Sequence, residues 1–397
     1  MTPFRTLDQA DVKGKRVLVR VDLNVPMTNG TVSDATRIAA SAVTINEIAD
    51  KGGKVILLSH FGRPKGRDPK SSLARIVAAA GKVIGRPVQF CDECVGETAE
   101  RAVAAMKPGD VLCLENTRFH AGEEKNDRDF TAGLARLADI WVSDAFSVAH
   151  RAHASTEGLG HMLPAFAGRA MQAELEALGR ALEQPQRPLA AIVGGAKIST
   201  KLELLGNLVK KVDVLIIGGA MANTFLAAHG KPVGKSLYEK DLVKTAQKIM
   251  ADARTDRRDI VLPVDAVAAQ KLAAHAPSRV VDVDHVKDTD MILDIGPRSV
   301  EHVVSVLARS KTLVWNGPFG AFETEPFDTG TIEVAEAAAE LTAAGKLVSV
   351  AGGGDTVAAL NAAGVADRLT YVSTAGGAFL EWMEGKALPG VEILRVK

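Results

Sequence analysis

Runs of apolar residues with almost no polar alternation recur along this chain, and stretches with helical periodicity separate them. In the first half, the runs predict strands at 16–21, 54–59, 87–91, 111–115 and 140–144. The stretches between them predict helices near 34–51, 72–84, 97–106 and 129–138, and Ser33 or Asp34 is expected to cap the first helix. Such apolar runs are typical of parallel strands that helices cover on both faces. The first half is therefore predicted to be a doubly wound α/β domain.

A second series of the same kind follows in the other half. Residues 164–184 have a long helical pattern, and the prolines within 185–188 interrupt it. Strands are then predicted at 189–195, 213–219, 259–263, 312–318, 347–354 and 369–377. The predicted fold class is α/β, with two doubly wound (Rossmann-like) parallel-sheet domains joined by a long helix and hinge, and with a cleft between them.

The domain bounds follow from these patterns. Residues 1–170 are predicted to form the N-terminal domain, 171–186 the interdomain helix, and 187–384 the C-terminal domain. No further element is expected after 385–397, so this tail is predicted to pack back on the N-terminal domain.

The charge balance excludes a general attraction to nucleic acid or to an anionic membrane, because Lys+Arg and Asp+Glu both number 48. No apolar run approaches the length of a membrane span, and the first residues lack the apolar core of a secretory signal. Cys91, Cys94 and Cys113 provide no disulfide framework, and the first two are interpreted as ordinary thiols rather than a metal site. The expected compartment is the cytoplasm.

Polar side chains follow the predicted strands of the first half, where ligands of open α/β sheets bind. They are Asp22, Asn24, His60, Arg63, Arg118 and Arg151, with Arg37 at the start of the first helix. Because the planar fork of arginine suits phosphate and carboxylate, this half is predicted to bind a small polyanion. Asp22 and Asn24 would bond its neutral groups, or Asp22 would orient an arginine. The alternatives are solvated loop arginines and an Asp and Asn that cap a turn.

Glycine follows the strands of the second half, where backbone amides can approach phosphates closely. The glycine motifs are GGAK (194–197), GGAM (218–221), NGPFG (316–320), GGGDT (352–356) and AGGA (375–378). None of them is a Walker A loop or a GxGxxG fingerprint. Lys197 and Lys201 are predicted at the head of a helix, facing phosphates. Asp355 is a candidate Mg²⁺ ligand, and the alternative is a helix N-cap.

These motifs together resemble the phosphoglycerate kinase family, and the resemblance extends over essentially the whole chain. The matching segments are RVLVRVDLNVP (16–26), SHFGRP (59–64), ENTRF (115–119), DAFSVAHRAHAS (144–155), GGAKISTK (194–201), GGAMANTF (218–225), WNGPFGAFE (315–323), GGGDT (352–356) and STAGGAFLE (373–381). The resemblance implies reversible phosphoryl transfer from 1,3-bisphosphoglycerate to MgADP, which gives 3-phosphoglycerate and MgATP.

The resemblance also implies roles for individual residues. The substrate site would comprise Asp22, Asn24, Arg37, His60, Arg63, Arg118 and Arg151. The nucleotide site would comprise Lys201, Gly219, Glu323, Gly353, Gly354, Asp355 and Thr356, with Mg²⁺ on Asp355. The catalytic groups around the transferred phosphoryl group would be Arg37, Lys197, Lys201, Gly376 and Gly377. Ser373 and Thr374 resemble the hinge segment of the family.

Such an enzyme is expected to be a monomer with only small-molecule partners, namely the phosphoglycerates and ADP or ATP. Two other functions are weighed against it. An NAD-dependent dehydrogenase would explain glycine-rich strand ends, but it would need a GxGxxG fingerprint. A two-domain binding protein for anions would explain the arginines, but it leaves the second, nucleotide-like site without a purpose.

Overall fold

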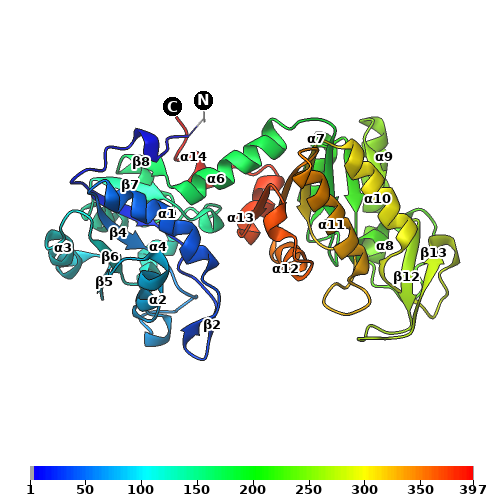
Figure 1. The fold of residues 1–397 in the computed structure, drawn as a ribbon, viewed down its shortest axis with the longest axis horizontal. Helices are drawn as coiled ribbons and strands as arrows, with labels where there is room; N and C mark the ends of the chain where they lie inside the picture. The colour runs from blue at the N-terminus through cyan, green and yellow to red at the C-terminus, as the bar shows by residue number, and fades with distance from the viewer. Residues whose placement is uncertain (1–3, 397) are drawn as a thin grey trace. The chain divides into compact units, whose positions relative to one another are not determined.

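The computed structural model describes residues 4–396, and it divides into two compact units. Unit 1 comprises Met1–Glu176 together with Ala387–Lys397, and unit 2 comprises Ala177–Lys386. Each unit is built on a six-stranded sheet with helices packed against it (Figure 1). Every strand pair in both six-stranded sheets is parallel. The predicted fold class, with two parallel-sheet α/β domains, is confirmed.

The sheet of unit 1 has the order β5-β6-β4-β1-β7-β8. Its strands are β1 (Arg16–Arg20), β4 (Lys54–Leu58), β5 (Val88–Cys91), β6 (Val111–Leu114), β7 (Ile140–Ser143) and β8 (Ala165–Ala167). Its helices are α1 (Thr36–Asp50), α2 (Ala74–Ile84), α3 (Gly96–Ala104), α4 (Ala121–Glu124) and α5 (Arg128–Ala135), and β2 (Met27–Thr28) pairs with β3 (Thr31–Val32). Val17, Leu18 and Val19 have no exposed surface, because β1 is central and covered on both faces.

Two local predictions in unit 1 need correction. The N-cap of α1 is Ala35, and Asp34 Oδ1 instead accepts from the Thr36 amide at 2.8 Å. The predicted helix over 164–184 is wrong at its beginning, because residues 165–167 form the edge strand β8. Helix α6 (Arg169–Leu178) begins after that strand, and a π-helical turn, Gly179–Glu183, continues it.

The sheet of unit 2 has the order β11-β10-β9-β15-β16-β17. Its strands are β9 (Leu189–Val193), β10 (Val214–Ile217), β11 (Asp259–Val261), β15 (Thr312–Asn316), β16 (Val348–Gly352) and β17 (Tyr371–Ser373). Its helices are α7 (Leu202–Lys211), α8 (Gly219–Ala228), α9 (Val243–Thr255), α10 (Pro297–Arg309), α11 (Thr329–Ala343), α12 (Gly354–Ala362) and α13 (Gly376–Met383). Because all six strands are parallel, the glycine motifs that follow them lie at one end of this sheet.

Unit 2 also has a three-stranded antiparallel sheet that the sequence pattern did not predict. It contains β12 (Asp265–Ala269), β13 (Ser278–Asp282) and β14 (Met291–Ile295), in the order β13-β12-β14. Figure 1 shows β12 and β13 at the margin of unit 2, beyond the lower end of α10. Strand β13 has no fully buried residue, so no apolar run marks it in the sequence.

The C-terminal tail packs against unit 1 through a short helix, α14 (Pro389–Glu392). The Gly390 amide donates to the Ala149 carbonyl oxygen at 2.8 Å, and the Arg5 amide donates to the Leu394 carbonyl oxygen at 3.1 Å. Leu388, Val391 and Leu394 are buried. The tail therefore contributes both backbone pairing and apolar core to this unit.

All three cysteines are buried and unpaired, and burial raises the pKa of the Cys113 thiol to about 12. Among residues 4–396, no helix is long and apolar enough to span a bilayer.

Candidate active site

Asp22 and Arg37 form an ion pair just beyond the carboxyl end of β1. Asp22 Oδ2 accepts from Arg37 Nη1 at 3.1 Å and from Ser147 Oγ at 2.5 Å. The same Arg37 nitrogen donates to the Asn24 carbonyl oxygen at 3.0 Å. Asn24 Oδ1 in turn accepts from the Gly62 amide at 2.8 Å. These contacts fix the Arg37 side chain. They leave the side-chain nitrogen of Asn24, Nδ2, available to donate.

His60 lies beyond the end of β4, next to β1 in the sheet, and only 4% of its surface is exposed. Its Nδ1 is 3.1 Å from Arg20 Nη2. Burial is the main cause that lowers the pKa of His60 far below its ordinary value, and the positive charges of Arg20, Arg118 and Arg151 lower it further. The imidazole is therefore neutral at physiological pH.

Arg118 and Arg151 place further positive charge near His60. Arg118 is 7% exposed and donates from Nη1 to the Gly62 carbonyl oxygen at 2.8 Å. Burial lowers the pKa of Arg118, with the charge of Arg151 as the next cause, so the two guanidinium groups are close enough to repel each other. The charge of Arg63 also lowers that pKa.

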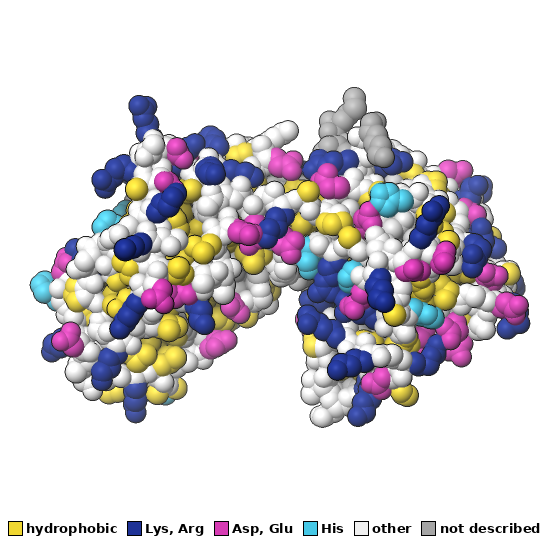
Figure 2. Space-filling model, turned by 180° about the vertical axis from the view of Figure 1, so that it is seen from behind, with side chains coloured by type: hydrophobic (Ala, Val, Ile, Leu, Met, Phe, Trp, Pro, Cys, Tyr) yellow, Lys and Arg dark blue, Asp and Glu magenta, His cyan; other side chains and the backbone are white. Residues whose placement is uncertain are grey.

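Arg63 is exposed and forms no ion pair or hydrogen bond with any residue between 4 and 396. Figure 2 shows Lys, Arg and His side chains gathered on part of the surface of unit 1, which lies on the right in that view. Carboxylates pair with only some of these arginines, since Arg118 Nε lies 3.2 Å from Glu124 Oε1 and Arg37 pairs with Asp22. The carboxyl end of this sheet thus keeps an excess of positive charge, which suits an anionic ligand.

Close contacts between glycines bring the strand ends of unit 2 together. Gly219 has φ +67°, and a Cβ there would lie 2.5 Å from the Gly195 nitrogen. Gly317 has φ +106°, and a Cβ there would lie 2.3 Å from the Gly194 carbonyl oxygen. Only glycine satisfies both the backbone conformation and the spacing at these positions. The ends of β9, β10 and β15 therefore form one continuous backbone surface.

Lys201 is tied to this surface by three oxygen atoms. Its Nζ donates to the Gly194 carbonyl oxygen at 2.6 Å, to Asn316 Oδ1 at 2.6 Å and to the Asn316 carbonyl oxygen at 3.2 Å. An ammonium has three N–H donors, so all of them are used. Burial lowers the pKa of Lys201 to about 8, and the nearby charge of Asp355 partly opposes that shift.

The expectation that Lys197 and Lys201 both lie at the head of a helix is wrong for Lys197. Helix α7 begins at Leu202, and Lys201 is its N-cap. Lys197 lies in the preceding loop, where it is exposed. No hydrogen bond or ion pair with another residue of 4–396 holds its side chain.

The segment Gly353–Asp355 lies at the N-terminus of α12, with Gly353 as the N-cap at φ +98°. The first amides of a helix have no partner within it, so this end can donate to an anion. Asp355 is exposed, whereas Thr356 is buried and accepts from the Gly317 amide at 2.7 Å through Oγ1. The side chain of Thr356 therefore supports the neighbouring loop. Gly376 and Gly377 are exposed at the start of α13. Helix α13 follows β17, which is the neighbour of the strand β16 that precedes α12.

A cavity of about 390 Å³ adjoins these strand ends. Gly219, Glu323 and Asp355 line it, together with apolar side chains that include Leu237 and Leu293. A partly apolar cavity with a few polar groups at its edge is typical of small-molecule sites.

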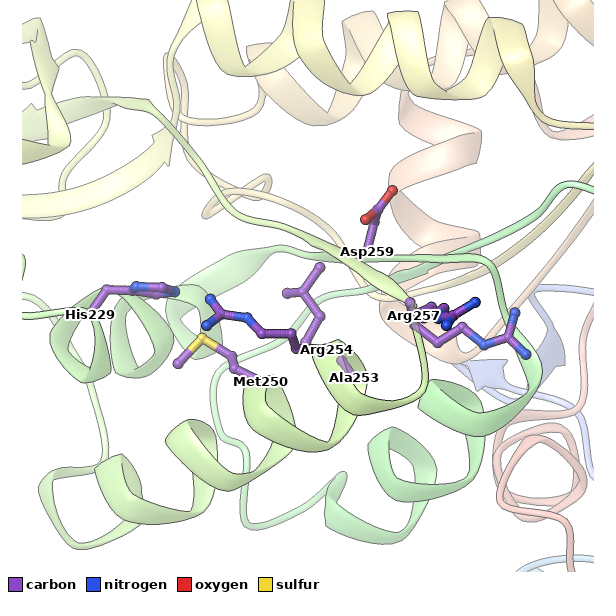
Figure 3. A pocket seen from close by; sticks show the side chains of 8 residues that line it. His229, Met250, Ala253, Arg254, Arg257 and Asp259 are labelled. Atoms are coloured by element: carbon purple, nitrogen blue, oxygen red, sulfur yellow. The ribbon is translucent and has the colours of Figure 1, made fainter.

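Another cavity in unit 2 lies away from these residues and is lined by His229, Met250 and three arginines (Figure 3). It adjoins the beginning of β11, at Asp259 and Ile260, rather than the carboxyl end of that strand. Figure 3 shows Arg254 directed toward His229 and Met250, with the Asp259 carboxylate pointing the other way. No predicted site residue lines this cavity, so it is separate from the candidate site.

Three residues of the site region were missed in the sequence. Arg20 contacts His60, Asn316 contacts Lys201, and Asp294 lines the 390 Å³ cavity. Asp294 accepts from the Ile295 amide at 2.8 Å and from the Gly330 amide at 2.7 Å, and burial raises its pKa to about 7. Asn316 begins the motif NGPFG, and Arg20 lies within RVLVRVDLNVP, so both belong to motifs described above. Asp294 lies in β14, a strand that no sequence motif marks.

The comparisons with known proteins agree with these observations. A sequence model of the family described as phosphoglycerate kinase matches residues 7–386. The phosphoglycerate kinase of Bradyrhizobium diazoefficiens is 65% identical over 394 residues, which cover 99% of each chain. That of Azorhizobium caulinodans is 66% identical over 395 residues, which cover 100% of each chain.

Solved structures give the same result. The phosphoglycerate kinase of Coxiella burnetii matches with a TM-score of 0.92 at 41% sequence identity, with 99% of each chain covered. That of Pyrococcus horikoshii matches with a TM-score of 0.83 at 30% identity, with 98% of each chain covered. The resemblance inferred from the motifs is confirmed. By sequence and by fold, this chain belongs to the phosphoglycerate kinase family.

Proposed function

We propose that unit 1 binds the phosphoglycerate and unit 2 binds the nucleotide in the reaction of this family. The chain is a phosphotransferase that converts 1,3-bisphosphoglycerate and ADP reversibly into 3-phosphoglycerate and ATP. One observation carries the division between the units: Arg37, Arg118 and Arg151 share one sheet end in unit 1, with exposed Arg63. Unit 2 offers glycine turns and a partly apolar cavity, which suit phosphates and a base.

In unit 1, the arginines would bind the charged groups of the substrate, and neutral side chains would form hydrogen bonds with it. Arg63 and Arg151 would hold the anionic groups of the substrate, and Arg118 would support them from a more buried position. Arg37 would face the carboxyl group that accepts the phosphoryl group. Because both oxygens of Asp22 already accept protein donors, its main contribution would be to orient Arg37. The side-chain nitrogen of Asn24, Nδ2, would donate a hydrogen bond to a substrate oxygen.

In unit 2, the nucleotide would occupy the cavity beside Gly219, with Glu323 near the ribose. Lys201 would exchange one of its protein acceptors for a phosphate oxygen. Gly353 and Gly354 would also meet the phosphates, and Thr356 would contribute through the backbone at the start of α12.

Asp355 would hold the Mg²⁺ that accompanies the nucleotide. Among residues 4–396, no group of three His, Cys, Asp or Glu side chains is placed to hold a metal ion. A single exposed carboxylate fits Mg²⁺, which takes one or two carboxylates and completes its shell with phosphate oxygens and water. When bound, the ion would neutralise phosphate charge.

Transfer itself would need positioning and charge more than covalent chemistry. The attacking oxygen belongs to a carboxylate or to a phosphate, so no general base and no phosphoenzyme are required. Arg37, Lys197, Lys201 and the amides of Gly376 and Gly377 would stabilise the phosphoryl group in flight. Because the ligands are proposed to bind different units, closure about α6 and Ser373–Thr374 would bring the reacting oxygens into line. The enzyme is proposed to act as a cytoplasmic monomer.

Two experiments test this assignment. A coupled assay should detect ATP made from ADP and 1,3-bisphosphoglycerate, and its absence in folded protein would overturn the proposal. Calorimetry on the Asp355→Ala variant should show weaker binding of MgADP, whereas the binding of 3-phosphoglycerate is retained. The opposite result would reverse the ligands of the two units.

A further inference from the structure

A chain of buried polar side chains leads through the interior of unit 1 to His60. It consists of Glu123, Ser155, Arg20 and His60, which are 0%, 0%, 2% and 4% exposed. Buried charges are retained only where their hydrogen bonds are made, because desolvation is costly. The order of donors and acceptors in this chain is therefore informative.

The contacts of Arg20 determine which nitrogen of His60 carries the proton. Arg20 donates from Nε to Ser155 Oγ at 2.9 Å and from Nη1 to the Val21 carbonyl oxygen. Its Nη2 lies 3.1 Å from His60 Nδ1. A guanidinium has only N–H donors, so Nδ1 must be the acceptor of this bond. A neutral His60 then carries its proton on Nε2.

The other end of the chain holds Arg20 in place. The Ser155 hydroxyl accepts from Arg20, so its own hydrogen is available to donate to Glu123 Oε1, which lies 2.5 Å away. The Ser155 amide donates to the other carboxylate oxygen at 3.1 Å. Glu123 thus supplies a counter-charge for Arg20 through a single hydroxyl group. Arg20 itself, at 2% exposure, lies behind the surface that a substrate would touch.

We propose that Arg20 is a positioning residue which, held by Ser155 and Glu123, fixes His60 as the Nε2–H tautomer, a neutral donor to the phosphoglycerate. This inference rests on the proposed place of His60 in the substrate site. The opposite tautomer would present a lone pair to an anionic ligand. The guanidinium groups already supply the positive charge. A neutral imidazole therefore contributes a hydrogen-bond donor in a fixed direction rather than a further charge.

The direct test is nitrogen NMR on the protein with ¹⁵N-labelled histidine and no ligand, with the signals of His60 assigned through His60→Gln. Between about pH 6 and 8, where an ordinary histidine titrates, Nε2 should be protonated and Nδ1 unprotonated throughout. A protonated Nδ1, or a cationic ring at neutral pH, would overturn the proposal.

The variant Ser155→Ala tests whether the chain matters for binding. It should produce a mixture of His60 tautomers and raise KM for 3-phosphoglycerate by about tenfold or more, because a bond to a charged ligand is misdirected. KM for MgATP should stay within about twofold, since unit 2 is not altered. Ser41→Ala is the matched control, because Ser41 is also buried in unit 1, at 2% exposure, but lies outside the chain.

The outcomes separate the two levels of inference. If Ser155→Ala changes neither the tautomer nor KM, Ser155 and Glu123 do not hold Arg20 in the position that fixes His60, and the proposal fails. If the tautomer is as stated but His60→Gln leaves KM for 3-phosphoglycerate unchanged, His60 is not in the substrate site, and the proposed function fails at that residue. Arg20→Ala is not the primary test, because its loss would leave Glu123 buried without a counter-charge.

Discussion

At the scale of single residues, the two sites hold their cationic side chains with different kinds of partner. Arg37 is held by a carboxylate and a backbone oxygen, whereas Lys201 is held by neutral oxygens alone. The carboxylate partner of Arg37 balances its charge and orients its side chain. The hydrogen-bond partners of Lys201 carry no charge, and the nearby charge of Asp355 compensates its ammonium only in part, so its protonation depends on burial and on the ligand.

Replacement of Arg37 by alanine should lower kcat by at least about a hundredfold while the fold survives, because a donor to developing charge is removed. Steady-state kinetics on both substrates measures the effect, and circular dichroism checks the fold. The control is Arg101→Ala, whose side chain is 74% exposed on α3. Near-normal turnover of Arg37→Ala would remove this residue from the mechanism.

The affinity for ADP should fall as the pH rises through about 8. The pKa of Lys201 is lowered to about 8, so the ammonium is charged below that pH and neutral above it. An anion binds the charged form better, and the loss should approach about tenfold per pH unit above the pKa. Calorimetry from pH 7 to 9 measures this trend. In Lys201→Ala, the affinity should be lower and nearly independent of pH, whereas Lys210→Ala at the other end of α7 should behave like the native chain.

Sequence reasoning succeeded best for residues whose neighbours along the chain are informative. Asp22 and His60 lie directly after apolar strands, and Arg37 lies in the first turn of α1, so their common location follows from the topology of the sheet. The partners that orient them cannot be found in this way. Arg20 bonds Ser155, which lies 135 positions away, and Lys201 bonds Asn316, which lies 115 positions away. Nothing local in a sequence encodes such pairs.

At the scale of elements, the glycine turns of unit 2 allow its strand ends to approach one another. Gly219→Ala should lower the free energy of unfolding by about 1–3 kcal/mol, because the new Cβ would lie 2.5 Å from backbone atoms of Gly195. The same variant should weaken ADP binding, since Gly219 lines the cavity.

The chain offers a matched control for that substitution. Gly206 lies in the middle of α7, and a Cβ there would meet nothing within 4 Å. Gly206→Ala should therefore raise the free energy of unfolding by about 0.5–1 kcal/mol, because glycine is a poor helix former. Denaturant titrations compare the two. Equal effects of both variants would show that space at Gly219 is not limiting.

The elements that sequence reasoning missed are those without a clear pattern. Strand β8 has three residues and follows Pro164, within a segment whose composition suits a helix. It forms because β7 offers an open edge, which is a tertiary effect. The long central strands were found because burial on both faces requires continuous apolar residues.

At the scale of the whole molecule, the proposed function requires the two units to approach each other. Small-angle scattering should show a smaller radius of gyration when 3-phosphoglycerate and MgATP are both bound than when either is bound alone. An unchanged radius with both ligands present would contradict closure about α6 and Ser373–Thr374.

The return of the tail to unit 1 affects how the protein is made. Unit 2 is one uninterrupted stretch of chain, whereas unit 1 is completed by Leu388, Val391 and Leu394. A ribosome therefore finishes all of unit 2 before it synthesises the residues that seal unit 1. Although domains generally fold in the order of their synthesis, the N-terminal unit here stays unfinished until the later one has emerged.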